Sequence, residues 1–546
     1  MGAFQDLIYT AIFLGVLVTV HEAGHYFAAK WANVKVIKFS IGFGPALFSF
    51  RRGETQYQIA AFPLGGFVQM AGMHADETVD TESDVEVERT YLGAPWWKRV
   101  IISLAGPAAN LVFPLVALFF VYLGDTTDFT PRIGSVEPGS PAAVAGMRPG
   151  DLIVSIDGTP IKTFTELSKI AGASADRELT IAVDRNGTQE TLHVTPANVE
   201  TLGMIEVQRK GRMGISLAEQ AAVLGVPAGS AAEAAGLRTF DRVIQVGGEP
   251  VRTVRELESA LDKATGTVKV QVVRFASIAP GVVSPQLIAA DVESTEGVGL
   301  ARIGAERGEA YVWEVRPNTP AAAMGIKIGD RFTMVGGQSV HSVGAVEDRM
   351  ALARKRRVDV AWMSAGELHT GAVGPLAPEG NAKYCMAPTD FGVRFGAPGL
   401  PMVPMAGETV TIHFGPVEAL QASLKKLPEG IMLIGKILSK LPTGEVPLES
   451  MGGPLQIAQV ASQTAEQGLD AFLSAMALVS VNLALVNLLP IPILDGFNIL
   501  IALWEAIRRR PPSIRVRELT TYFGFAVLGL LMIVAFRNDI ARLLFC

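Results

Sequence analysis

The chain has 546 residues, of which 49% are hydrophobic and 18% are charged, and its formal net charge is −6. This length favours several domains over a single core, and the mean hydropathy of +0.33 is high for a soluble protein. The acidic balance argues against nucleic acid as a partner. The two cysteines, Cys385 and Cys546, cannot build a disulfide framework or a thiolate zinc site.

Four apolar stretches predict membrane-spanning helices. Three of them carry no charged residue and are long enough to cross about 30 Å of hydrocarbon: residues 100–124, 471–494 and 519–536. The first stretch, residues 7–20, is shorter, and it reaches spanning length if its helix continues through Ala29. We therefore expect an integral membrane protein with four spans, for which the lipid bilayer is the surrounding partner.

Basic residues predict the orientation, because positively charged loops stay in the cytoplasm. The loop after the third span carries Arg508, Arg509, Arg510, Arg515 and Arg517. The loop after the first span carries Lys30, Lys35, Lys38, Arg51 and Arg52. Both loops are expected in the cytoplasm, which places the long segment 125–470 on the outer side of the membrane.

The outer segment contains an internal repeat. Three stretches share a turn, a short Ala-rich helix ended by glycine, and a β-branched strand: residues 136–158, 226–248 and 315–337. The repeat is regular, since its aspartates follow one another at intervals of 90 and 89 residues: Asp151, Asp241 and Asp330. A fixed period of this length predicts an array of similar domains.

The repeat resembles PDZ domains of the bacterial protease-associated type, which bind extended peptides or chain ends along the edge of a sheet. The resemblance implies PDZ 1 at 128–205, PDZ 2 at 210–297 and a PDZ-like third copy at 298–378. A β-rich spacer that binds nothing is the alternative. Residues 379–465 are expected to form a linker with amphipathic helices, either on the membrane surface or packed in a domain.

Residues 21–25 read His-Glu-Ala-Gly-His inside the first span. On a helix, H-E-x-x-H places both imidazoles on one face, where they can bind one metal ion beside a glutamate that acts as general base. Ionisable side chains at mid-membrane cost roughly 2.5–3.5 kcal/mol, so they usually do chemistry. We therefore interpret His21 and His25 as metal ligands and Glu22 as the base.

A third ligand has to come from elsewhere, because catalytic zinc takes three protein ligands and leaves a fourth position open. Asp495 is the charged residue that closes the third span. Pro490 and Pro492 break the helix just before it and expose backbone groups that need a cavity or protein partners. Asp495 is the candidate ligand, and the alternative is a helix-end carboxylate that reaches water.

H-E-x-x-H and the pattern N-x-x-P-x(4)-D-G at 487–496 together resemble the site-2 protease family of intramembrane zinc proteases, peptidase family M50. Further stretches match motifs of that family: AGPAANL at 105–111, AFPLGGFVQM at 61–70 and GGPLQIA at 452–458. The third PDZ-like copy departs from the family pattern.

The resemblance implies a polytopic α-helical membrane protein with four transmembrane helices and inserted extracytoplasmic β-rich PDZ domains. Its first membrane half would cover 1–124 and its second membrane half 466–546. The expected location is the bacterial inner membrane, with several spans, the PDZ region in the periplasm and the active site near the cytoplasmic side.

The resemblance also implies a zinc metalloendopeptidase in which Zn²⁺ is held by His21, His25 and Asp495, with Glu22 as the catalytic residue. A membrane-associated β element at 55–70 would pair with the unwound substrate. The implied substrate-binding residues are Asn482, Asn487, Gly65 and Gly66.

The implied reaction is regulated intramembrane proteolysis of single-span membrane proteins. The substrate would be an anti-sigma factor or a remnant signal peptide, with the PDZ domains filtering what approaches. A second hypothesis is a non-catalytic membrane PDZ scaffold whose metal site is structural or vestigial. The intact Glu22 argues against this scaffold, because a structural metal site needs ligands but no base.

Overall fold

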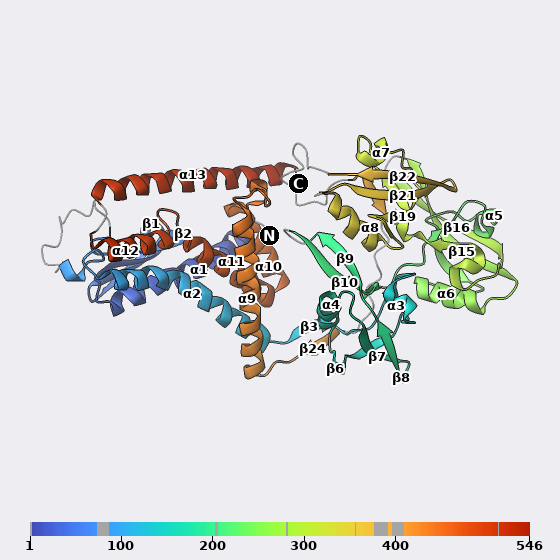
Figure 1. Cartoon of the computed structure of the whole chain (residues 1–546), viewed down its shortest axis with the longest axis horizontal. Coiled ribbons are helices and arrows are strands. Elements are labelled where there is room, and N and C mark those ends of the chain that lie inside the picture. The colour runs from blue at the N-terminus through green and yellow to red at the C-terminus, as the bar shows by residue number, and fades with distance from the viewer. Residues whose placement is uncertain are drawn as a thin grey trace. The chain divides into compact units, whose positions relative to one another are not determined.

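The computed structural model describes residues 3–73, 87–202, 206–279, 282–354, 356–375, 391–395, 409–510 and 513–545. The chain divides into two compact units (Figure 1). The membrane unit combines residues 1–126 and 412–546. The module unit is formed by 127–380 and 387–411. The strands β3 (Thr126–Phe129) and β24 (Thr409–Ile412) pair where the chain passes between the units.

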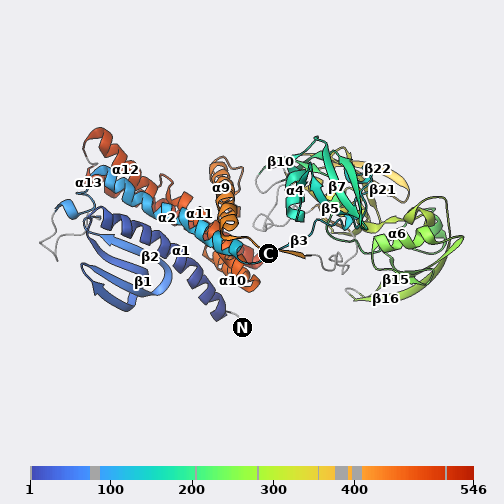
Figure 2. The ribbon, with the colours of Figure 1, turned by 90° about the horizontal axis from the view of Figure 1, so that it is seen from below.

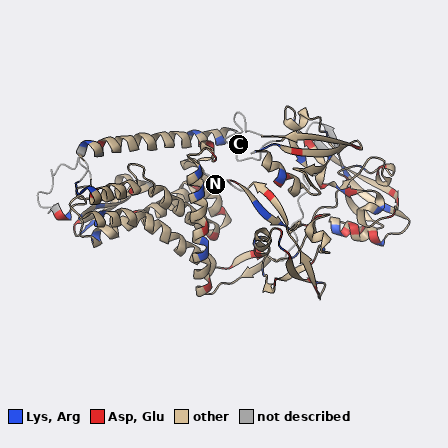
Figure 3. Ribbon diagram, viewed as in Figure 1, with Lys and Arg blue, Asp and Glu red and all other residues tan. Residues whose placement is uncertain are grey.

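Long apolar helices build the membrane unit. They are α1 (Ala3–Trp31), α2 (Trp96–Leu123), α9 (Pro416–Lys440), α10 (Pro454–Gln467), α11 (Leu469–Asn487), α12 (Asp495–Arg508) and α13 (Ile514–Phe545). Four stretches are long and apolar enough to cross a membrane: Phe4–Trp31, Trp96–Leu123, Leu469–Asn487 and Glu518–Leu544. The four expected apolar helices are therefore present, with the length and composition that a membrane span requires. Charged residues of α13 lie toward its two ends, as the coloured ribbon in Figure 3 shows.

The first span is longer than its uncharged run, as the sequence predicts, because α1 continues through the two histidines to Trp31. The third span is shorter than its uncharged run, because α11 ends at Asn487 and α12 begins only at Asp495. The helices α1, α2 and α11 pack against one another, and α12 packs on α2.

A bent β-hairpin lies beside α1 (Figure 2). It consists of β1 (Val36–Arg52) and β2 (Thr55–Met70), and β2 has the bounds of the predicted β element. The strands fold back on themselves, so residues 38–41 pair on one side with 56–59 and on the other with 66–69. In the described part of the chain no further strand pairs with 66–68, so this segment forms an edge of the sheet.

The helix α9 is continuous across Pro428 and packs on α2 and α11. Its buried residues are Ala419, Ser423 and Ile434. Its exposed large apolar residues are Val417, Leu420, Leu424 and Met432. One face therefore belongs to the helix bundle, while the other presents apolar side chains outward.

The module unit repeats one four-stranded sheet three times. In module 1 the order is β6-β5-β7-β8: β6 (Thr159–Pro160), β5 (Leu152–Ile156), β7 (Leu179–Arg185) and β8 (Thr188–Val194). In module 2 it is β14-β13-β15-β16: β14 (Glu249–Pro250), β13 (Arg242–Val246), β15 (Thr267–Ala279) and β16 (Val282–Glu293). In module 3 it is β20-β19-β21-β22: β20 (Gln338–Ser339), β19 (Arg331–Val335), β21 (Val358–Ser364) and β22 (Glu367–Val373).

Each module also contains one short and one longer helix. These are α3 (Pro141–Val144) and α4 (Phe164–Ala173), α5 (Ala231–Ala234) and α6 (Val254–Lys263), and α7 (Pro320–Ala323) and α8 (Val343–Met350). Each module has its own cluster of buried apolar side chains. The repeat read from the sequence is therefore three copies of one fold, each with its own core.

The last strand of each module pairs with its first strand. The pairs are β4 (Ser135–Val136) with β11 (Ile215–Ser216), β12 (Leu224–Gly225) with β17 (Glu306–Arg307), and β18 (Val312–Val315) with β23 (Val393–Phe395). Each closing strand lies beyond the end of its domain as drawn from the sequence, at 205, 297 and 378 respectively. The reason is that these closing strands are distant in sequence from the first strands and too short to show alternation.

A glycine brings each closing strand into place. Gly214, Gly304 and Gly392 have φ of +79°, +64° and +93°, a conformation that favours glycine. A Cβ on each of them would lie within about 3.2 Å of the N-cap residue of the short helix, which is Ser140, Ser230 and Thr319 in turn.

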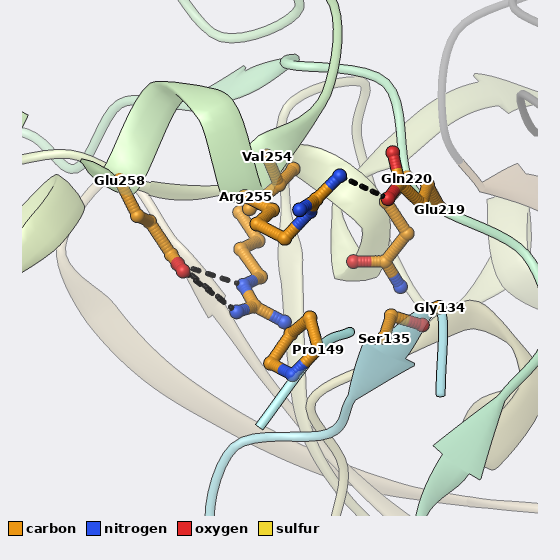
Figure 4. A pocket seen from close by; sticks show the side chains of 9 residues that line it. Gly134, Ser135, Pro149, Glu219, Gln220, Val254, Arg255 and Glu258 are labelled. Atoms are coloured by element: carbon orange, nitrogen blue, oxygen red, sulfur yellow. Dashed lines mark hydrogen bonds and ion pairs between the residues drawn. The ribbon is translucent and has the colours of Figure 1, made fainter. Parts of the chain in front are cut away.

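A hollow lined by residues of modules 1 and 2 contains two ion pairs (Figure 4). Arg307 of module 2 donates to both carboxylate oxygens of Glu258 and to the backbone oxygen of Val136 in module 1. Arg255 forms an ion pair of 2.7 Å with Glu219 at the same hollow. The bond from Arg307 to the backbone oxygen of Val136 joins the two modules, whereas the ion pair of Arg307 with Glu258 lies within module 2 and holds the arginine in place.

Candidate active site

The two histidines of H-E-x-x-H lie where α2 crosses α1 at very short distance. A Cβ on Gly24 would lie 2.2 Å from the backbone oxygen of Ala105, and a Cβ on Gly106 would lie 2.3 Å from His25 Nε2. Glycine is therefore required at both positions for this approach. The approach encloses the imidazoles, so that His21 and His25 keep 7% and 8% of their surface exposed.

A backbone carbonyl orients the ring of His25. Its Nδ1 lies 2.8 Å from the oxygen of Ile102 on α2, so Nδ1 carries the hydrogen and donates it. The other ring nitrogen, Nε2, then presents a lone pair to the interior of the site. This is the usual way in which a second contact prepares a histidine for metal binding.

Asn110 plays the same part for His21. This asparagine is fully buried on α2, and its amide lies 3.1 Å from Nδ1 of His21. Its Oδ1 is buried and has no hydrogen-bond partner among the residues that the structure describes. Turning the amide by half a rotation brings this oxygen to Nδ1, where it accepts a hydrogen and leaves Nε2 free for a metal.

Asp495 completes the group at the first residue of α12. The chain turns sharply before it, and Ile493 has φ of +86°. The two carboxylate oxygens lie 3.1 Å from His21 Nε2 and 3.3 Å from His25 Nε2. The helix break predicted at Pro490 and Pro492 is present, and it brings the carboxylate to the histidines.

The three residues fit a metal ion by the chemistry of their donors. The ligand atoms of His21, His25 and Asp495 all lie within 4.8 Å of one another. Both Nδ1 atoms are engaged by α2, so each Nε2 presents a lone pair, as do the carboxylate oxygens of Asp495. These lone pairs repel one another unless a cation lies between them. Two imidazoles and one carboxylate are a ligand set of catalytic zinc, which keeps a position open for water.

Glu22 lies between this group and the β-sheet edge. Its carboxylate interacts with the charges of His21, His25 and Asp495 and with the backbone amide of Val68. A Cβ on Gly66 would lie 3.5 Å from Glu22 Cγ and 2.7 Å from the oxygen of Ser40. Gly66 therefore allows the edge segment 66–68 to run close to the glutamate.

Among the other predicted substrate-binding residues, Asn487 lies next to His21. Asn487, the last residue of α11, places its Nδ2 3.4 Å from His21 Nε2. Asn482 is exposed and lies five residues earlier, about 140° around the helix. Gly65 packs on the aromatic ring of Phe43, in the hairpin itself.

Asn110 and Ile102 are the site residues that the sequence analysis did not identify. Both lie on α2, and neither residue type signals metal chemistry. The run of small residues AGPAAN, 105–110, was the available signal, because small residues in an apolar helix permit close packing.

The fold and the site define the class: a metallopeptidase of the H-E-x-x-H type built into a bundle of spanning-length helices. The model of peptidase family M50 matches residues 9–531, so the chain belongs to that family. It is a protease by membership of this family.

Full-length relatives agree with this assignment. The protease RseP of Yersinia pestis is 29% identical over 552 residues, 100% of both chains. The regulator of sigma-E protease RseP of Escherichia coli is 28% identical and covers 98% of this chain and 99% of its own. A Vibrio cholerae relative, named provisionally as a zinc metalloprotease, is 28% identical over 97% of both chains. A solved PDZ domain protein from Parabacteroides distasonis aligns with 46% of this chain at 10% identity. The TM-score of 0.11 is too low to show a shared fold.

Proposed function

We propose that this protein is an intramembrane zinc metalloendopeptidase that cuts the spanning helices of single-span membrane proteins. The observation that supports this most directly is the convergence of His21, His25 and Asp495 inside an apolar helix bundle, with Glu22 beside them. Such a group has a high cost in lipid unless it binds a cation and performs chemistry.

His21, His25 and Asp495 would hold the zinc ion, and Glu22 is the general base. When bound, zinc supplies Lewis-acid polarisation of the scissile carbonyl and makes the attacking water more acidic. Glu22 takes the proton of that water and returns it to the leaving amine. Asn110 and the Ile102 carbonyl hold the two imidazoles in the orientation that this chemistry requires.

The sheet edge 66–68 would hold the substrate as an extended strand. A helical substrate hides its carbonyls in intrahelical hydrogen bonds, so it has to unwind before it can be attacked. An unpaired edge offers backbone partners to an unwound segment. Gly66 and Asn487 contribute at this place, since Gly66 keeps the edge close to Glu22, and Asn487 offers an amide next to His21.

The substrate class that we propose is a single-span protein such as an anti-sigma factor, or a remnant signal peptide. The relatives named as regulators of sigma-E protease support the first choice. Modules 1 to 3 are proposed as periplasmic PDZ domains that filter substrates by size, with the active site near the cytoplasmic face of the inner membrane. The basic loops at 30–52 and 508–517 support this orientation.

The exchange Glu22→Gln tests the catalytic proposal. The variant should bind zinc at one ion per chain and should not cleave a model membrane-spanning peptide in detergent or liposomes. Asp6→Asn, a carboxylate-to-amide change on the same helix, is the matched control and should cleave normally. Equal cleavage by Glu22→Gln and wild type would rule out the base, and wild-type protein that binds zinc but cleaves nothing would favour a scaffold.

Deletion of residues 131–395 with a short linker tests the filter. This range ends after β23, so it removes all three modules with their closing strands. A zinc-loaded deletion variant should cleave a substrate whose outer domain has not been trimmed, whereas the wild type should reject it. Continued rejection by the deletion variant would exclude the filter without affecting the catalytic proposal.

A further inference from the structure

The helix α13 is attached to the rest of the membrane unit at two separate places. Among the residues of α13 whose burial the structure describes, the buried ones are Gly524, Ala535, Asn538, Asp539 and Ala541. Between the first of these and the other four, every residue from 525 to 534 is exposed or partly exposed. The helix is therefore held around Gly524 and, separately, around residues 535–541.

The attachment near the C-terminal end is a set of hydrogen bonds to the start of α10. Asp539 accepts from the backbone amides of Gly453, Leu455 and Gln456 at 2.9, 2.9 and 3.2 Å. These are the free amides of a helix N-terminus, which an acidic side chain satisfies well. Asn538 donates to the backbone oxygens of Leu448 and Met451. This attachment fixes α13 along its own axis.

The other attachment is a close contact with the turn that carries Asp495. A Cβ on Gly524 would lie 2.5 Å from the backbone oxygen of Pro492 and 2.6 Å from its Cβ. Real Cβ atoms do not come this close, so a larger residue at 524 has to push the turn or the helix away. Fifteen residues separate Gly524 from Asp539, about 22 Å along a helix, so the C-terminal attachment determines which residue meets Pro492.

The turn at Pro492 has little freedom to absorb such a push. Pro492 has a fixed φ, and Ile493 after it already has φ of +86°, which is unfavourable for a β-branched residue. The turn itself is packed as tightly, because a Cβ on Gly496 would lie 2.3 Å from the oxygen of Leu488. A displacement at Pro492 is therefore transmitted to Asp495, three residues further on.

We propose that Gly524 is a positioning residue, which lets α13 support the turn at Pro492 and thereby sets the place of the Asp495 carboxylate relative to His21 and His25. This inference rests on the proposed metal site. It assigns to α13, which supplies no ligand, a part in holding the third ligand. Residues that orient metal ligands from outside typically contribute 10- to 100-fold to metal affinity or activity.

Gly529 provides a matched control on the same helix. It is exposed, and a Cβ on it would have no neighbour within 4 Å among the described residues. Replacing either glycine with alanine or leucine raises helix propensity equally. A difference between the two positions therefore reports the contact with Pro492 and not the properties of the isolated helix.

The test compares Gly524→Ala and Gly524→Leu with Gly529→Ala and Gly529→Leu in the full-length protein. Zinc affinity is measured by competition with a chelator, the ligand geometry by the visible absorption spectrum of the Co²⁺-substituted protein, and activity as separate kcat and KM values. We expect Gly524→Ala to weaken zinc binding about 10-fold, to alter the Co²⁺ spectrum and to lower kcat with little change in KM. Both Gly529 variants should match the wild type.

Gly524→Leu should lower zinc affinity and kcat further than Gly524→Ala does and should alter the Co²⁺ spectrum more. If Gly524→Leu does not fold, the result for Gly524→Ala tests the inference. A wild-type Co²⁺ spectrum and zinc affinity in Gly524→Ala would overturn the inference, even if the variant melted at a lower temperature, because a mere packing role would produce that result. Failure of the wild type to bind zinc would overturn the proposed function instead, so the two failures are distinguishable.

Discussion

Asp151 in module 1 and Asp495 in the membrane unit are both largely buried aspartates, and they differ in the groups that face their carboxylates. Asp151 receives hydrogen bonds from Arg185 Nε at 2.8 Å, from Arg185 Nη2 at 2.7 Å and from the amide of Arg148 at 2.9 Å. Asp495 faces two imidazole nitrogens whose lone pairs point at it. Hydrogen-bond donors surround the first carboxylate, whereas the second one forms the group in which we propose a bound zinc ion. The nature of the neighbours, and not burial, separates a structural carboxylate from a metal ligand.

The modules repeat the structural arrangement with one exception. Asp241 in module 2 receives two hydrogen bonds of 2.7 Å from Arg274, as Asp151 does from Arg185. In module 3 the position that corresponds to Arg185 and Arg274 is occupied by Ser364. It follows Met363, which pairs with Arg331. Asp330 is 3% exposed, and within the described residues no arginine forms an ion pair with it. Module 3 thus lacks, within the described residues, the arginine–aspartate ion pair that modules 1 and 2 share.

Exchanging each aspartate for asparagine should have the largest effect and should separate the two sites. Asp495→Asn should lower zinc affinity by more than about 100-fold, beyond the usual effect of an outer residue, and should abolish cleavage. Asp151→Asn should leave zinc content and cleavage rate unchanged and should lower the resistance of module 1 to proteolysis. Unchanged zinc stoichiometry in Asp495→Asn would place the third ligand elsewhere.

Removing the arginine partner should have the next largest effect. Arg185→Ala leaves a buried charge without compensation, which costs about 3–5 kcal/mol of unfolding free energy. Urea-dependent proteolysis of module 1 in the full-length protein measures this loss. Arg177→Ala, whose side chain is 59% exposed in an ion pair with Asp157, is the control and should cost under about 1 kcal/mol. A similar cost for both exchanges would contradict the structural reading of Asp151.

Glu309 is a third kind of buried carboxylate, with neither an arginine fork nor histidines. It lies in η3 (Gly308–Ala310), and in the described part of the chain its Oε1 has no hydrogen-bond partner. Burial is the main cause that raises its pKa to about 7 from 4.5, against the opposing charge of Arg307. As the pH rises from 4.5 to 7, the unfolded chain loses this proton before the folded chain does, so the free energy of unfolding falls.

Glu309→Gln should remove this fall, which is on the order of 3 kcal/mol across the interval. Urea-dependent proteolysis of the module unit at pH 5 and pH 8 measures it. Glu249→Gln, at a side chain that is 66% exposed, should leave the pH dependence as in the wild type. A Glu309→Gln variant that loses stability in the same way would show that other groups cause the dependence.

Asn110→Ala should have the smallest effect, because Asn110 touches a ligand and not the metal. Loss of its contact with His21 Nδ1 should weaken zinc binding about 10- to 100-fold, with the fold retained. Asn482→Ala, an amide that is exposed on α11, is the matched control for zinc affinity. If both variants bind zinc as tightly as the wild type, Asn110 does not orient His21.

Much of this protein could be predicted from local patterns. The four apolar stretches, the β element at 55–70, the repeat and the histidine spacing each lie within a short window, where periodicity and composition suffice. Asp495 could be predicted because an acidic residue after two prolines at the end of an apolar run is rare and has a physical cost there. The family resemblance assigned the roles.

Only the tertiary structure decided which distant groups meet. The contact of Asn110 with His21, the close approach at Gly24 and Gly106, and the support of Pro492 by Gly524 join segments that are far apart in sequence. The closing strand of each module is likewise paired with a strand about 80 residues earlier. Such contacts depend on how whole helices and strands pack, and no local pattern of residue types records packing between elements. The sequence by itself therefore determined the chemical groups of the site, and the packing of α2 and α13 decided what holds them in place.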